Sequence, residues 1–111
     1  NHLHPPFNNV KSRRAALAAI DQIGFLQAVI GDPRYYKEGP AMFMYGSSLA
    51  TDKGADIIMK SYYALSKKLL KEAGYDDTPI VVMQSTDVDV LNNLGSTAAQ
   101  HLRCGGFKVD L

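Results

Sequence analysis

The sequence predicts an α/β fold with a helix pair, a long loop, and then a helix, a strand, a helix and a strand, with the two strands parallel. Three observations predict this fold. Apolar residues recur three and four positions apart over residues 10–30 and in two later segments, which is the period of an amphipathic helix. Two short segments near the end of the chain, one continuously apolar and one alternating apolar and charged residues, have the length of strands. Residues 31–56 follow neither period, so a long loop is expected there.

The helix pair is expected over residues 10–30. Asn8 or Asn9 is a suitable N-cap, because a short polar side chain can accept a hydrogen bond from an early backbone N–H. Gly24 is expected to break the segment into two helices, since glycine is a poor helix former. Asp21 lies near that break and can cap the second helix.

Two further helices are expected over residues 62–73 and 88–103. Gly74 ends the first, because glycine readily adopts the left-handed conformation at helix ends, and Gly105-Gly106 ends the second. The predicted core-facing stripes are Tyr62, Leu65, Leu69 and Ala73 in the first helix, and Val88, Leu91, Gly95, Ala98 and Leu102 in the second.

Strands are expected at residues 80–84 and 107–111. The first is a continuous apolar run, as in a strand buried on both faces. The second alternates apolar and charged residues, as in a strand covered on one face. A strand, helix and strand in one sheet form a parallel pair through a right-handed crossover.

Composition suits one domain of a globular protein. The chain has 111 residues, of which 46% are hydrophobic and 21% charged. A net charge of +1 gives no reason to expect nucleic acid or an anionic membrane as a partner. No apolar run reaches the roughly 20 residues of a membrane span. The first residues lack the basic and apolar regions of a signal peptide and read like sequence from inside a domain, so we expect an excised fragment.

An ordered set of short motifs runs through nearly the whole chain. Pro5-Pro6-Phe7 leads into a helix with Arg13 and Ala15, which closes with Ala19-Ile20-Asp21. The later motifs are Ser66, Lys67, Leu69, Leu70, Glu72, Ala73, Gly74 and Tyr75, and then Leu102, Gly106, Phe107, Val109 and Leu111. No single motif is specific, but in this order they resemble one lobe of the extracellular solute-binding proteins of ABC importers, in the peptide/nickel class known as family 5.

Two positions depart from the family pattern. Ser12 lies where the family usually has an apolar residue, and Gly105 lies where it usually has Ile. The second departure removes a core side chain, so we expect looser packing there or a site filled by Cys104.

The resemblance implies a fragment, residues 1–111, of the second lobe of a two-lobe protein with a periplasmic-binding-protein-like fold. It implies an extracytoplasmic, periplasmic substrate-binding component of an ABC importer, which captures peptides or another small solute by closure of two lobes. The full-length protein would meet a membrane permease. Neither catalysis nor a cofactor is implied. Because excision exposes strand edges, we expect the fragment to form a homodimer.

Two segments are candidates for ligand binding. Phe43, Met44, Tyr45 and Gly46 place aromatic and Met side chains on irregular backbone, which suits an adaptable pocket wall. The alternative is that they form core under the loop. The second candidate segment follows a strand, at the end where ligands bind in open α/β sheets, and contains Gln84, Thr86 and Asp87. Here Asp87 can pair with a cation such as a peptide amine, or else Thr86 or Asp87 caps the next helix.

Other reactive residues give weaker signals. His2 and His4 have a spacing that suits a metal, but no third ligand lies nearby, so no metal site is predicted. Cys104 needs a base such as His101 to act as a nucleophile, and it reads better as a small, half-buried hydrophobe. Ala50 rules out a nucleophile elbow around Ser48. The main alternative function is a small cytosolic α/β enzyme or regulator that uses Asp87 at a strand end, and the third is a structural interaction domain.

Overall fold

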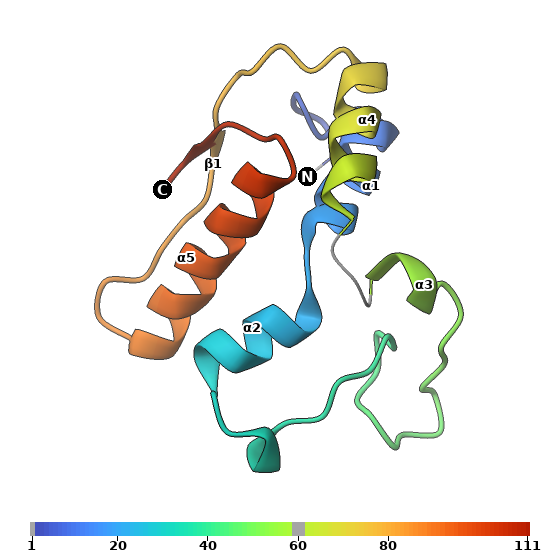
Figure 1. Cartoon of the computed structure of the whole chain (residues 1–111), viewed down its shortest axis with the longest axis vertical. Coiled ribbons are helices and arrows are strands. Elements are labelled where there is room, and N and C mark those ends of the chain that lie inside the picture. Colours follow the sequence, from blue (N-terminus) through green and yellow to red (C-terminus); the bar gives the residue numbers. More distant parts are fainter. Residues whose placement is uncertain (1, 59–61) are drawn as a thin grey trace.

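The computed structural model describes residues 2–58 and 62–111. Its elements follow the predicted order of a helix pair, a long loop, and then helix, strand, helix and strand (Figure 1). They are α1 (Val10–Ala19), α2 (Gln22–Val29), the short 3-10 helix η1 (Pro33–Tyr35), α3 (Ala55–Ile58), α4 (Tyr63–Ala73), β1 (Ile80–Val81), α5 (Asp89–Cys104) and β2 (Val109–Asp110). None of the helices in the described part is both long and apolar enough to cross a membrane.

The first two helices separate at Ile20 and Asp21, whose backbones are extended. The prediction of a break at Gly24 is therefore wrong, since Gly24 lies inside α2. The prediction for Asp21 is confirmed, because its side chain accepts a hydrogen bond from the Ile23 N–H at 3.2 Å and caps α2. The two helices separate because they pack on different partners, α1 against α4 and α2 against α5.

The α1–α4 contact is built from small side chains. Ala15 and Ala18 are fully buried in α1, and Ser66 is fully buried opposite them in α4. The Ser66 hydroxyl donates to the Ala15 carbonyl at 2.9 Å, so its burial leaves no unpaired polar atom. The predicted stripe on α4 is wrong at Tyr62 and Leu65, which are 42% and 39% exposed, because the buried face is turned toward Ser66 and Leu70.

Larger apolar side chains gather where α4, α5 and the strands meet. Leu70, Ile80 and Phe107 are buried together with Ala15. The Phe107 ring lies 6.0 Å from the Phe7 ring and 5.5 Å from the Tyr75 ring, and both partners are partly buried. Aromatic pairs at this spacing add to the stabilisation from burial alone. The segments that carry the sequence motifs thus form one core.

The C-terminal end of α5 packs closely, contrary to the expectation for Gly105. A Cβ atom at Gly105 would lie 2.6 Å from the Ala19 Cβ and 2.7 Å from the Ser66 Oγ. No larger side chain fits there without movement of the helices, so packing is tight and not loose. Cys104 is exposed, so it neither fills a space nor acts as a half-buried hydrophobe.

The buried side of α5 is also narrower than predicted. Gly95 and Ala99 are buried, and Leu102 packs against the core. The predicted core positions Val88 and Leu91 are wrong, since they are 45% and 50% exposed.

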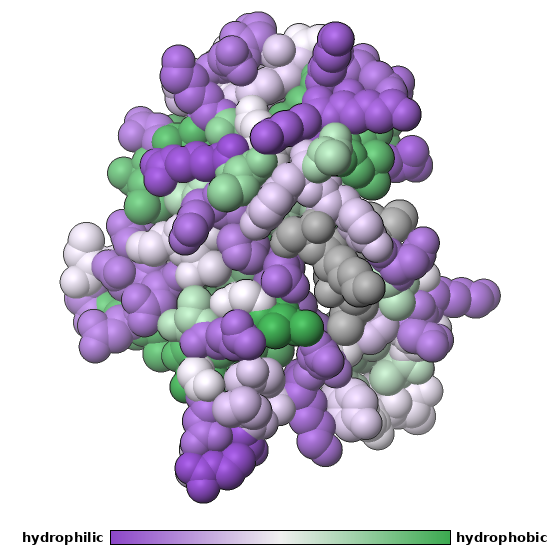
Figure 2. Space-filling model, in the orientation of Figure 1, coloured by the Kyte–Doolittle hydropathy of each residue, from purple (hydrophilic) through white to green (hydrophobic). Residues whose placement is uncertain are grey.

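The two strands are parallel neighbours, as predicted, with Ile80 opposite Val109. Each has only two residues, so the expected ranges were too long. The expectation of burial on both faces is wrong, because Val81 and Met83 are 75% and 92% exposed. Nothing in residues 2–58 or 62–111 covers their outer side. Figure 2 shows that apolar residues on the visible face gather in separate patches divided by hydrophilic ones.

Candidate functional site

The loop between η1 and α3 is irregular, as the sequence predicts. Gly46 and Gly54 have left-handed backbone φ values of 82° and 81°, which interrupt regular secondary structure at these two positions. Short turns bring the chain back on itself, with hydrogen bonds from the Ser47 N–H to the Met44 carbonyl at 3.0 Å and from the Ala50 N–H to the Ser47 carbonyl at 3.1 Å. We call residues 37–52 the ligand loop, because they contain residues 43–46, which the sequence predicts to bind a ligand, and most of them line the hollow described next.

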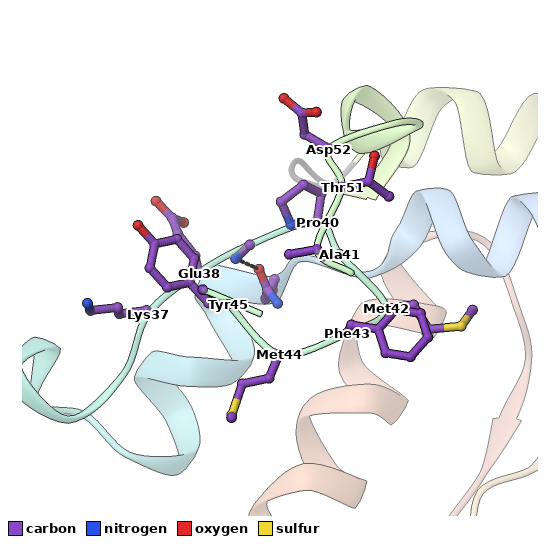
Figure 3. Close-up of a pocket in the computed structure, with 14 residues that line it drawn as sticks. Lys37, Glu38, Pro40, Ala41, Met42, Phe43, Met44, Tyr45, Thr51 and Asp52 are labelled. Atoms are coloured by element: carbon purple, nitrogen blue, oxygen red, sulfur yellow. Dashed lines mark hydrogen bonds between the residues drawn. The ribbon is translucent and has the colours of Figure 1, made fainter. Parts of the chain in front are cut away.

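The ligand loop lines most of an open hollow of about 890 Å³. All four predicted residues of this segment line it, namely Phe43, Met44, Tyr45 and Gly46. Figure 3 shows Lys37, Glu38 and Tyr45 toward one end and Met42 and Phe43 toward the other. Its charged lining residues are Lys37, Glu38 and Asp52. The hollow therefore offers apolar and aromatic surface with a few charged groups around it.

The large side chains of the ligand loop are not core. Phe43 is 51% exposed, Tyr45 is 63% exposed and Met44 is 82% exposed. The alternative that this segment forms core beneath a long loop is therefore wrong in this structure. The Lys37 ammonium lies 5.0 Å from the centre of the Tyr45 ring, a cation–π contact that orients the ring.

One side chain from outside the loop holds it to the helices. The Gln22 Oε1 atom, at the first position of α2, accepts a hydrogen bond from the Gly39 N–H at 2.9 Å (dashed line in Figure 3). A second hollow, of about 610 Å³, is lined by Gln22, Gly39 and Met42 together with Leu17 and Phe25 of the helices. Sequence reasoning missed Gln22, because a polar residue at the start of a helix is ordinary and carries no signal of a loop contact.

The second predicted segment lies apart from the ligand loop. The Gln84 Nε2 atom donates to the Asn92 carbonyl at 3.2 Å and to the Ser96 Oγ at 2.5 Å, so this side chain ties its own segment to α5. In Figure 1 the segment lies on the other side of α2 and α5 from the ligand loop. None of Gln84, Thr86 and Asp87 lines the hollow of about 890 Å³.

Asp87 and Thr86 do not cap α5. The N-cap position is Val88, which makes no side-chain capping bond, so the capping alternative is wrong. The Asp87 carboxylate instead accepts a hydrogen bond from the Ser85 hydroxyl at 2.6 Å. This bond is the main cause that lowers the pKa of Asp87, and the carboxylate is charged at neutral pH.

His101 lies in the contact between α5 and α2. Its Nδ1 atom accepts a hydrogen bond from the Asp21 N–H at 3.2 Å. Burial lowers the pKa of His101, and the nearby Asp21 carboxylate opposes this effect more weakly. Across residues 2–58 and 62–111, no group of three or more His, Cys, Asp and Glu side chains is placed to hold a metal ion.

Comparison with known sequences gives a family for the whole chain. The family model described as "Bacterial extracellular solute-binding proteins, family 5 Middle" matches residues 1–111. The y4tO protein of Sinorhizobium fredii, named as a periplasmic-binding protein of a peptide ABC transporter, is 35% identical over 112 residues. That match covers 100% of this chain and 21% of y4tO, so the chain spans about a fifth of this relative's length.

Two solved structures share the fold. The ABC transporter substrate-binding protein CtaP from Listeria monocytogenes has a TM-score of 0.81 at 23% identity, over 100% of this chain and 22% of CtaP. AppA from Clostridium difficile, whose name links it to peptide binding, has a TM-score of 0.73 at 16% identity, over 94% of this chain and 21% of AppA. These relatives are named as binding proteins and not as enzymes. The chain belongs to the bacterial extracellular solute-binding proteins of family 5.

Proposed function

We propose that the protein containing this chain is the extracytoplasmic substrate-binding component of an ABC importer, and that residues 1–111 are part of its second lobe. It captures a peptide or another small solute between two lobes and delivers it to a membrane permease. The observation that carries this proposal is the family match over the whole chain, which a small cytosolic enzyme or regulator would not produce. The y4tO relative supports peptide as the solute and the periplasm as the location.

The ligand loop is this lobe's share of the binding site. Its hollow has the volume of a small-molecule pocket, typically about 300–1,000 Å³. Phe43, Met44 and Tyr45 make no contribution to the core, so their apolar surface is free for contact with a ligand. The hollow is open, and a second lobe is needed to enclose a solute and remove it from water. Met adds adaptability, which suits a protein that accepts more than one side chain.

Binding by the ligand loop can be tested in the full-length protein. A panel of short synthetic peptides is screened by thermal shift, and the best binder is titrated by calorimetry. Tyr45→Ala and Phe43→Ala are each expected to weaken binding by about tenfold, as truncation of a buried aromatic anchor does. Leu49→Ala is the matched control, since Leu49 is an equally exposed apolar residue of the same loop outside the hollow. Unchanged affinity in both aromatic variants would place the contacts elsewhere.

Gln84, Thr86 and Asp87 form a second, separate candidate contact. Asp87 is charged and solvent-exposed, and its segment follows β1 in the chain. If a peptide amine meets this carboxylate in the closed protein, Asp87→Ala weakens binding by about tenfold or more. Asp89→Ala, in the first turn of α5, is the control for a general loss of negative charge. Equal effects from the two variants would argue against a specific contact at Asp87.

We also infer that the isolated 111-residue chain forms a homodimer. Val81 and Met83 expose apolar side chains beside a two-stranded sheet whose edges no other strand of the described residues covers, and such edges pair readily with another chain. Sedimentation equilibrium is expected to give twice the monomer mass. Met83→Lys is expected to shift the chain toward monomer, because a charge on an edge segment opposes pairing. A clean monomer for the unaltered chain at high concentration would contradict this inference.

A further inference from the structure

The imidazole ring of His101, on α5, contacts the start of α2. The His101 Nδ1 atom accepts from the Asp21 N–H at 3.2 Å, and the ring meets the Phe25 ring edge-on at 5.1 Å. Gly24 makes this fit possible, because a Cβ atom there would lie only 3.0 Å from the His101 Cε1 and 3.1 Å from its Nε2. A glycine in the middle of a helix weakens that helix, so its presence here is explained by the close approach of the ring.

The hydrogen bond at Asp21 requires neutral His101. The Asp21 N–H lies between two helices and has no partner within α2, so it needs an acceptor from elsewhere. An imidazole nitrogen accepts only with a free lone pair, which places the ring proton on Nε2. Protonation of Nδ1 would set a donor against the Asp21 N–H. The Asp21 carboxylate is the charged group that acts on the ring within the described chain, and Gly24 and Phe25 on α2 carry no charge.

The same short helix holds the ligand loop. Gln22 follows Asp21 directly and accepts from the Gly39 N–H at 2.9 Å. Phe25, which contacts His101, also lines the second hollow beneath the loop together with Met42. Helix α2 has only eight residues, so a shift at its start is passed to both of these loop contacts.

We propose that His101, in its neutral form with Nδ1 as acceptor, is a positioning residue for the ligand loop, acting through Asp21 and Gln22 at the start of α2. The consequence for solute binding rests on the proposed function, whereas the consequence for the loop does not.

The inference carries a pH dependence whose sign follows from the lowered pKa of His101. A histidine in the unfolded chain titrates near pH 6.5, and the folded state holds the neutral form to lower pH. The stabilising contribution is therefore fully present above about pH 6.5 and is lost as pH falls through the folded-state pKa. Acidification is expected to release the start of α2 and to loosen the ligand loop.

Hydrogen exchange in the full-length protein tests the link from His101 to the loop. In His101→Leu, the Gly39 amide of the loop is expected to exchange about fivefold faster than in the unaltered protein, the factor for loss of one ordinary hydrogen bond. Gln22→Ala is expected to give the same increase in the loop. His101→Asn keeps an acceptor near the Nδ1 position and cannot titrate, so it is expected to retain protection and to lose the acid response. His4→Leu, at an exposed histidine, is the control at each pH.

Two results would overturn the inference. One is unchanged loop exchange in both His101→Leu and Gln22→Ala. The other is a nitrogen-15 spectrum, assigned by comparison with His101→Asn, that places the ring proton on Nδ1 at neutral pH. If Tyr45→Ala leaves peptide affinity unchanged while His101→Leu still loosens the loop, the proposed binding site fails and this inference stands. If Tyr45→Ala weakens binding and the loop exchange never changes, this inference alone fails.

Discussion

The α1–α4 contact and the ligand loop use opposite kinds of residues. The contact between α1 and α4 buries Ala and Ser side chains, and Gly105 closes it from the end of α5. The ligand loop exposes Phe43, Met44 and Tyr45, which are far more apolar and larger. Space, more than hydropathy, therefore decides which side chains are buried between these closely packed helices. The large apolar side chains of the loop stay exposed within the described residues.

The two regions also differ in how they are held. In the α1–α4 contact, the Ser66 hydroxyl and the Tyr62 N–H bond to carbonyls of α1 at 2.9 and 2.8 Å. The ligand loop is tied to α2 through one side-chain bond, from the Gly39 N–H to Gln22. A substitution in the loop should therefore change binding with little effect on stability, and one in the core should do the reverse.

The largest expected effect is at Phe107. Phe107→Ala removes a ring that is only 3% exposed and contacts two other rings, so it should lower the free energy of unfolding by about 3–5 kcal/mol. Phe43→Ala makes the same chemical change in the ligand loop and should lower it by less than about 0.5 kcal/mol. Urea denaturation of the full-length protein, followed by circular dichroism, gives both values. Similar losses would show that the loop ring is part of the core.

Two glycines test more directly whether the space around a residue limits the size of its side chain. Gly105→Ala should destabilise the protein by about 1–3 kcal/mol, because the new methyl group would overlap Ala19 and Ser66. Gly39→Ala should be close to neutral, since the nearest atom to its Cβ is a Tyr45 ring carbon at an ordinary 3.6 Å. The same denaturation measurement applies. A neutral Gly105→Ala would mean that the helices can separate there without cost.

Ser12 and Ser66, the serines that are buried within residues 2–58 and 62–111, separate the role of size from the role of hydrogen bonding. Ser66→Ala loses the bond to the Ala15 carbonyl and should cost about 1–2 kcal/mol. Ser12 is 2% exposed, and we find no partner for its hydroxyl in the described part of the chain. Ser12→Ala should therefore be neutral or stabilise by up to about 1 kcal/mol, since it removes an unpaired buried hydroxyl. A loss at Ser12 as large as that at Ser66 would reveal a partner such as a buried water.

The smallest expected effect on stability is at Met42, which is 95% exposed. Met42→Ala should change the free energy of unfolding by less than about 0.5 kcal/mol, within the range of surface substitutions. The informative readout is peptide affinity by calorimetry, where loss of apolar lining should weaken binding measurably. A stability loss above 1 kcal/mol would mean that the two hollows lined by Met42 are closed in solution.

The sequence predicted the elements well where local signals are strong. Asn9 and Asp21 both cap helices through their side chains, and Gly74 ends α4 in the left-handed conformation. The parallel pairing of the strands also followed from their order. Local signals did not predict the buried face of α4. Ser66 is polar, and the hydrogen bond to the Ala15 carbonyl that allows its burial forms only in the tertiary structure.

The candidate site was predicted in part for the same reason. The ligand loop was recognisable from its lack of periodicity and its run of aromatic and Met residues. Gln22 and His101 were not recognisable as its supports, because their partners lie 17 and 80 residues away in the sequence. The position of Gln84 to Asp87 relative to the loop likewise depends on how α2 packs against α5.

The bond from the Gly39 N–H to Gln22 has an evolutionary consequence. It uses only the main chain of the loop, and a Cβ at residue 39 would make an ordinary contact of 3.6 Å with the Tyr45 ring, so alanine at this position is expected to preserve the bond and proline to remove it. Mutation can therefore change the side chains that face the hollow while the hydrogen bond from Gly39 to Gln22 is kept. Relatives that keep this bond could change the surface of the hollow without first acquiring a new way to hold the loop.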